Sequence, residues 1–181
     1  MRAFDRSRVP VEYRNLPLLD QMEAESIAQL KDPNYRWAIA THEAAHGVYR
    51  LRAGATKLIY VGPYFFYDIE AKTVQKVVAG ISSEWGSLTH LDFKNVARYC
   101  GAGWIWEKEV CPYSTDAEAS ADRDRAVFDA DVHRVHPDAT NEEIQMYWGR
   151  AEAEVKADLQ NLEIRSQIEK LALDFKKFLE D

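Results

Sequence analysis

Residues 38–48 read AIATHEAAHGV, and within them His42 and His46 stand four positions apart with Glu43 directly after the first histidine. On an α-helix this spacing puts both imidazoles on one face, about one turn apart. Two such nitrogens can share one Zn²⁺ at bond lengths of about 2.0–2.1 Å. Zinc lowers the pKa of a bound water to roughly 7, and Glu43 could accept its proton. The stretch predicts a zinc metallopeptidase with Glu43 as general base.

The predicted helix around this motif is apolar nearly all round, with Trp37, Val48 and Leu51 among its large side chains. A helix of this kind is normally interior. A carboxylate on an interior helix is costly unless something pairs with it, and a metal site would explain why Glu43 stands there. The alternative is two hydrogen-bonded core histidines beside a half-exposed glutamate.

Three segments resemble the peptidase domain of the FtsH-type ATP-dependent zinc proteases. Residues 38–48 are similar to the HEAGHA helix of that family, residues 79–84 (AGISSE) to its AGRAAE helix, and residues 119–126 to its GAxxD segment. The resemblance implies a mainly helical zincin-like domain in which His42, His46 and Asp122 bind zinc and Glu43 is the base. No G-x-x-x-x-G-K-[ST] phosphate loop occurs in the 181 residues, so we expect a stand-alone peptidase domain without the ATPase.

The third zinc ligand is the least determined part of this site. A metzincin continuation would need glycine at 49 and histidine at 52, where this chain has Tyr49 and Arg52. Asp122 is favoured because Ala119 and Ala126 on the same helical stripe would allow close approach to a metal. Acidic residues also gather in the first turns of helices to complement the helix dipole. Three alternatives therefore stay open, namely Glu84, Asp116 and Asp124.

The remaining sequence predicts a mainly α fold. Pro10 and Pro17 bracket a polar stretch, so we expect residues 1–16 to form an irregular arm and residues 17–181 to form one domain. Residues 86–116 are expected to be a partly helical insertion with a short helix at 91–100, either a lid or a packing patch. Helices are predicted at about 18–30, 34–52 (capped by Asn34), 71–85, 117–135, 141–161 and 163–179, the last two as a helical hairpin, with a β-hairpin at 57–69.

Composition limits the partners. The net charge of −7 argues against a nucleic-acid or anionic-membrane surface. No secretory signal or membrane-spanning segment is evident, so we expect a cytoplasmic protein in which Cys100 and Cys111 are reduced thiols. The expected partner is a peptide or protein substrate. Weaker candidates for a second metal site or for assisting catalysis are His90, His133 and His136, and the two cysteines are weaker still as metal ligands.

Two competing functions remain. The chain could be a peptidase-like module, zinc-retaining or inactive, that regulates a partner protein by binding it. It could also be a metal-free helical interaction protein in which the HExxH string is accidental.

Overall fold

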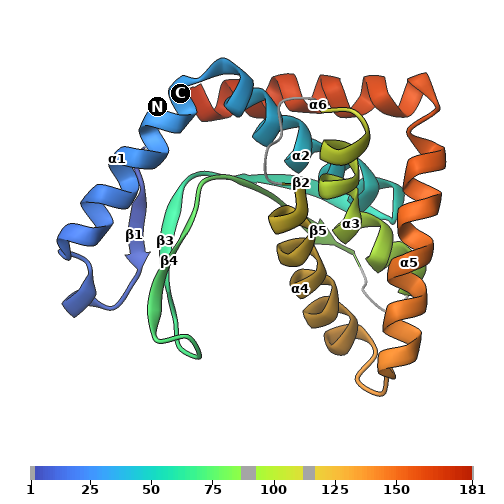
Figure 1. Cartoon of the computed structure of the whole chain (residues 1–181), viewed down its shortest axis with the longest axis horizontal. Coiled ribbons are helices and arrows are strands. Elements are labelled where there is room, and N and C mark those ends of the chain that lie inside the picture. The colour runs from blue at the N-terminus through green and yellow to red at the C-terminus, as the bar shows by residue number, and fades with distance from the viewer. Residues whose placement is uncertain (1–2, 87–92, 112–116, 181) are drawn as a thin grey trace.

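The computed structural model of the chain describes residues 3–86, 93–111 and 117–180 (Figure 1). The described part is mainly helical, as the sequence predicts, with small sheets beside the helices. Its elements in chain order are β1 (Asp5–Arg8), the 3-10 helix η1 (Val11–Tyr13), α1 (Pro17–Lys31), α2 (Pro33–Arg52), β2 (Ala55–Val61), β3 (Tyr64–Asp68), β4 (Thr73–Val77), β5 (Gly80–Trp85), α3 (Phe93–Glu109), α4 (Ala117–Val135), α5 (Asn141–Asp158) and α6 (Leu162–Glu180).

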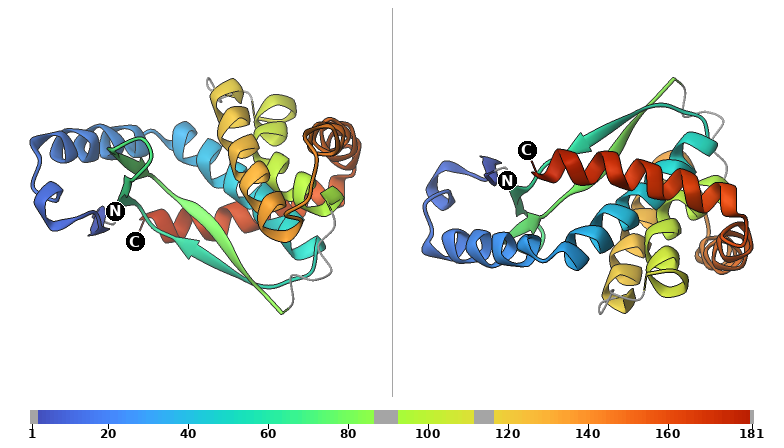
Figure 2. Two further views of the ribbon diagram at one scale, coloured as in Figure 1. Left: turned by 90° about the horizontal axis from the view of Figure 1, so that it is seen from below. Right: turned by 90° about the horizontal axis from the view of Figure 1, so that it is seen from above.

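Helix α2, which carries the HExxH motif, is the central element. It contacts α1, α3, α6, β2 and β5, and both views of Figure 2 show α6 on one side of it and α3 and α4 on the other. Its many alanines let these neighbours approach closely, and Ala40, Ala44 and Ala45 are fully buried. Asp32 rather than the expected Asn34 caps the helix, since its carboxylate accepts the Asn34 N–H at 2.8 Å.

The main core gathers around α2 and α3. Phe128 of α4, Val155 of α5 and Phe175 of α6 are fully buried in one apolar cluster with residues of α2 and α3. Apolar residues spaced along one face of α5 (Ile144, Ala151, Val155) and of α6 (Ile164, Ile168, Phe175) are buried in this core. The two helices do not form the expected hairpin, however, because α5 packs against α3 whereas α6 packs against α2 (Figure 1).

Residues 71–85 were expected to form a helix, and this prediction is wrong. They form β4 and β5, in keeping with the β-branched residues at 73, 74, 77, 78 and 81. The predicted hairpin at 57–69 is also wrong in its pairing. Strands do form there, but β2 pairs with β5, while β3 pairs with β1 and β4. At Gly62-Pro63 the chain therefore leaves the β2-β5 sheet and enters the β1-β3-β4 sheet.

The described part of the expected irregular arm contains a short strand and a 3-10 helix, and several of its side chains are buried. Strand β1 runs parallel to β3, and Phe4 and Val9 are buried with Leu19 of α1 and Phe65 of β3 in a second apolar cluster. Arg6 ties β1 to α1 through ion pairs with Asp20 and Glu23. In Figure 1 the elements around this cluster lie to one side of the main core, namely β1, α1, β3 and β4.

The predicted insertion supplies a core element. Its expected short helix is a longer one, α3, which packs against α2, α4 and α5. Cys100 on α3 and Cys111 just after it are free and buried. Within the described ranges, no helix is both long enough and apolar enough to cross a membrane.

Candidate metal centre

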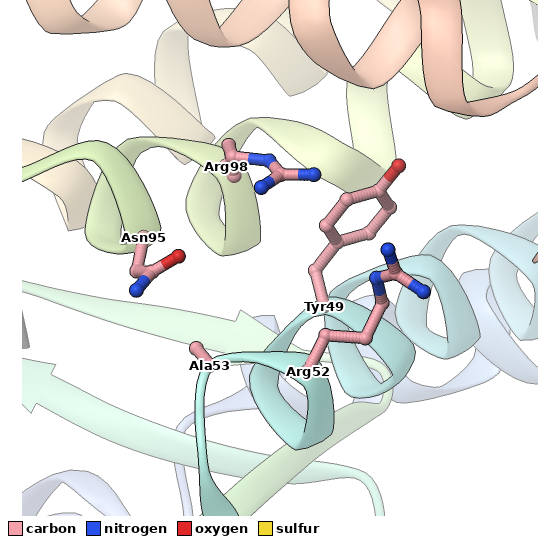
Figure 3. A pocket seen from close by; sticks show the side chains of 5 residues that line it. All are labelled: Tyr49, Arg52, Ala53, Asn95 and Arg98. Carbon is pink, nitrogen blue, oxygen red and sulfur yellow. The ribbon is translucent and has the colours of Figure 1, made fainter.

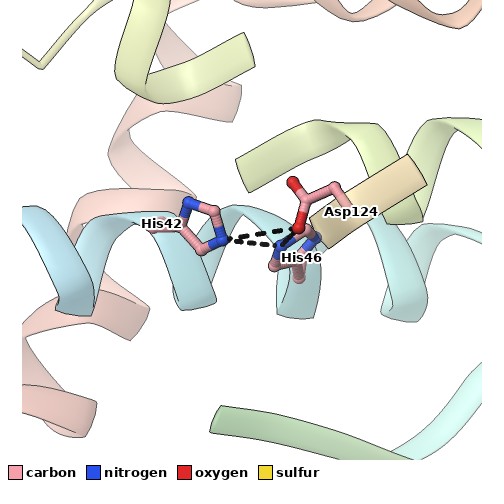
Figure 4. A group of neighbouring side chains, drawn as sticks. All are labelled: His42, His46 and Asp124. Atoms are coloured by element: carbon pink, nitrogen blue, oxygen red, sulfur yellow. Dashed lines mark hydrogen bonds and ion pairs between the residues drawn. The ribbon is translucent and has the colours of Figure 1, made fainter. Parts of the chain in front are cut away.

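Three side chains from two helices converge on one point. His42 and His46 of α2 meet Asp124 of α4, and their ligand atoms all lie within 4.8 Å of one another (Figure 4). The two Nε2 atoms are 3.0 Å apart, and Asp124 Oδ1 is 3.3 Å from Nε2 of His46 and 3.7 Å from Nε2 of His42. Ligands of a tetrahedral ion with bonds of about 2.0 Å are separated by about 3.3 Å. The group therefore could bind a metal ion.

Helix α3 places an oxygen atom close to Nδ1 of each imidazole, on the side of the ring away from Nε2. Nδ1 of His46 is 2.7 Å from the backbone carbonyl of Tyr99. Because a carbonyl only accepts, Nδ1 carries a proton, which leaves Nε2 as the ring nitrogen that faces the site and can act as a ligand. Nδ1 of His42 lies 3.3 Å from Oε1 of Glu107, an ion-pair contact without the geometry of a hydrogen bond. Metal-binding histidines commonly have a carboxylate or carbonyl partner on the second nitrogen, so this arrangement suits ligation through both Nε2 atoms.

Asp124 is held in a similar way. Its second oxygen, Oδ2, accepts the backbone N–H of Trp104 at 3.1 Å. Burial favours the neutral carboxyl, but the charges of His46 and His42 and this N–H hold the pKa of Asp124 below its ordinary value. The carboxylate is therefore ionised and available as a ligand.

The local charge balance favours a cation. Burial would lower the pKa of His42, but the nearby carboxylates of Glu107, Asp124 and Glu43 outweigh it and raise that pKa to about 9. For Glu107, burial is likewise outweighed by His42 and by a hydrogen bond with Ser120, so the pKa of Glu107 is lowered. Three carboxylates around two imidazoles attract either a proton or a metal ion.

Glu43 stands beside this group without belonging to it. Its Oε2 accepts the Ile81 backbone N–H of β5 at 3.0 Å, and its Oε1 is 3.9 Å from Nε2 of His42. One oxygen is therefore anchored while the other faces the point where His42, His46 and Asp124 converge. A general base needs this position relative to a water at the metal.

Gly103 allows α3 to come this close. An added Cβ at position 103 would lie 2.6 Å from both Cε1 and Nε2 of His42 and closer still to Nε2 of His46. Real Cβ atoms essentially never approach so closely, so a side chain at this position would displace the imidazoles.

The structure does not bring Asp122 to the site. Asp122 is exposed, whereas Asp124, one of the open alternatives, is buried beside both histidines. Two positions along a helix turn a side chain by about 200°, so the two aspartates point to different sides of α4. The sequence held a signal for this, because Asp124 shares its stripe with Phe128 and Val132, both fully buried.

The other candidates lie elsewhere. Glu84 is exposed on strand β5 and pairs with Lys57 at 3.2 Å. His133 is exposed, and His136 packs against the ring of Phe93. Cys100 and Cys111 are not part of the three-residue group. Asp116 and His90 lie outside the described residues. Glu107 and Gly103 of α3 also adjoin the site. The sequence predicts only a lid or a packing patch for residues 86–116 and does not indicate that either residue adjoins the histidines.

Comparison of the chain with protein-family models, with curated proteins and with solved structures gives no match. The segment compared with the AGRAAE helix, residues 79–84, falls mostly within strand β5, so this part of the resemblance does not hold as a helix. What the site defines by itself is a buried group of two histidines and one aspartate that could hold a metal ion.

Proposed function

We propose that the chain is a zinc-dependent metallopeptidase of the HExxH type, related in its site to the FtsH-type peptidase domain. His42, His46 and Asp124 would hold the ion and Glu43 would be the general base. The single observation that carries this is the convergence of Asp124 on the HExxH histidines with Glu43 anchored alongside. A donor set of two imidazoles and one carboxylate suits zinc and leaves a coordination position for water or substrate.

When bound, zinc would supply Lewis acidity toward a peptide carbonyl and toward water. Proton transfer and the orientation of the ligands fall to residues of the chain. Oε1 of Glu43 accepts a proton from the attacking water and can return it to the leaving amine. The Ile81 N–H holds Oε2 in place. Glu107 and the Tyr99 carbonyl keep the two imidazoles oriented. This division of roles makes Glu43 dispensable for metal binding and necessary for turnover.

The test compares metal content and peptidase activity in wild type, Glu43→Gln and Asp124→Asn. We expect about one zinc per chain in wild type and in Glu43→Gln, but a large loss in Asp124→Asn. Cleavage of unfolded casein should occur only in wild type. Absence of tightly bound metal in wild type after zinc is offered would contradict the proposal and favour the metal-free interaction protein.

A second candidate is a metal-retaining module that binds a partner without cleaving it. The observation in its favour is that the backbone groups of Ile81 on β5 are already hydrogen-bonded to α2. The Ile81 N–H donates to Glu43, and the Ile81 carbonyl accepts from Arg50. A peptide adding to this strand would have to compete for those groups. Zinc in wild type without casein cleavage, together with a biological role that survives Glu43→Gln, would favour this module.

A further inference from the structure

A polar pocket lies at the end of α2 beyond the metal centre. Its volume is about 300 Å³, and it is lined by Tyr49, Arg52 and Ala53 of α2 and by Asn95 and Arg98 of α3. None of the five belongs to the group of His42, His46 and Asp124 or to Glu43. Figure 3 shows Asn95 and Arg98 on one side of the pocket, across from Ala53 and Arg52.

The charges around this pocket are unbalanced. Arg98 pairs through Nη2 with Asp158, which also accepts the Tyr49 hydroxyl at 3.2 Å. Within the described part of the chain, no carboxylate forms an ion pair with Arg52, whose side chain is exposed. Arg98 is thus paired with Asp158 and, at 3.7 Å, with Glu154, which Lys94 shares. Arg52 adds a positive charge at the pocket that no described carboxylate pairs with.

Arg98 also has hydrogen-bonding capacity to spare. Among the described residues, its side chain forms one hydrogen bond, from Nη2 to Asp158, while its Nε is buried without a partner. The nearest charged oxygen of Glu154 is 3.7 Å away, too far for a hydrogen bond, and Glu154 is shared with Lys94 at 3.4 Å. A guanidinium has five N–H donors in a planar fork that matches phosphate and carboxylate oxygens. The pocket thus offers donors and positive charge together.

We propose that this pocket binds a small oxyanion group, a phosphate or a carboxylate, between the guanidinium groups of Arg52 and Arg98, with Asn95 lining the same pocket. The volume is at the low end of the range for ligand pockets, which suits a small ligand or the charged end of a larger one. The pocket uses no metal ligand, so this inference stands independently of the proposed peptidase activity.

The experiment titrates inorganic phosphate into the full chain at constant ionic strength and follows the backbone amide resonances of Ala53, Asn95 and Arg98 by NMR. We expect saturable shifts in wild type and at least tenfold weaker binding in Arg52→Ala. Arg150→Ala, which removes another exposed arginine that does not line the pocket, is the control and should bind like wild type. Arg98→Lys keeps the charge and the Asp158 pair but loses the fork, and it should also weaken binding.

A second titration identifies the source of the oxyanion. It compares a short peptide that has a free C-terminal carboxylate with the same peptide amidated. Stronger binding of phosphate than of either peptide assigns the pocket to a small phosphorylated ligand, whereas preference for the free carboxylate assigns it to a peptide terminus. Neither probe saturating the pocket, or equal losses in Arg52→Ala and Arg150→Ala, would overturn the proposal.

Discussion

Nδ1 of His42 lies 3.3 Å from Oε1 of Glu107, so a carboxylate on α3 faces the side of the imidazole turned away from Asp124. Glu107 is largely buried, and its other oxygen, Oε2, has no hydrogen-bond partner. Burying an ionised carboxylate is costly unless a charge compensates it. The ion pair with His42 supplies that charge and holds a carboxylate against Nδ1, although Nδ1 lacks the geometry of a hydrogen bond. This makes Glu107 a positioning residue for the proposed metal centre.

Replacing Glu107 tests this role. Glu107→Gln keeps the shape but removes the charge that orients His42, and we expect the zinc affinity to fall roughly 10–100-fold. Competition with a chromophoric chelator measures it. Glu109→Gln on the same helix is the control, because Glu109 pairs with Lys156 away from the site. Equal affinities for the two variants would remove Glu107 from the centre.

The two aspartates of α4 can be separated directly. Asp124→Asn removes the charge of the buried oxygen that lies 3.3 Å from His46, and it should abolish tight zinc binding. Asp122→Asn changes an exposed side chain and should leave the metal content unchanged. Metal analysis of both purified variants gives the answer. A loss of zinc in Asp122→Asn alone would restore the assignment that the sequence favoured.

Gly103 and Gly101 form a matched pair on α3. Either change to alanine should favour the helix by up to about 1 kcal/mol, because glycine is the poorer helix former. In Gly101→Ala the new Cβ meets its nearest atom at 3.4 Å, so we expect neutral or slightly raised stability. In Gly103→Ala the Cβ collides with His42 and His46, so zinc binding should be lost. Chemical denaturation and metal content are measured for both, and unchanged zinc in Gly103→Ala would contradict the described approach of α3.

Metal removal should lower thermal stability, because an ion that binds only the folded state stabilises it by mass action. With free zinc at a thousand times its dissociation constant, the gain is about 4 kcal/mol, or roughly 8–16 °C in the melting temperature of a chain this size. Calorimetry with and without a chelator measures the shift. Asp124→Asn should show little difference between the two conditions, and a chelator that leaves wild type unchanged would argue against a resident ion.

The thiol of Cys100 should be unreactive in the folded protein. Burial, with a smaller contribution from Asp131, raises its pKa well above the ordinary value. The thiolate, which is the reactive form, is therefore scarce, and access is blocked as well. We expect Cys100 to react with a thiol reagent at pH 8 only after unfolding, as followed by mass spectrometry in Cys111→Ser. Rapid labelling of the native chain would contradict the packing of α3.

Local patterns in the sequence were enough for most of the helices. Asp32-Pro33 and Gly54 bound α2, and the apolar stripes of α5 and α6 indicate which faces are buried. The same local patterns misassigned residues 71–85 and paired the strands wrongly. Strand pairing depends on contacts between residues far apart in the chain, such as Ile59 with Ser82, which no short window contains.

By itself, the sequence determined that His42, Glu43 and His46 share a helical neighbourhood, because a spacing of four residues fixes their geometry on any α-helix. Only the tertiary structure decided that Asp124 rather than Asp122 meets them. It also decided that Glu107 lies beside Nδ1 of His42 and that Gly103 lies against the Nε2 side of both imidazoles. The physical reason is that α4 is oriented with Phe128 and Val132 buried in the core, and Asp124 lies on the same face of the helix. The packing of α3 against α2 depends on the absence of a side chain at Gly103, and the helical periodicity of α3 does not reveal which helix it will contact.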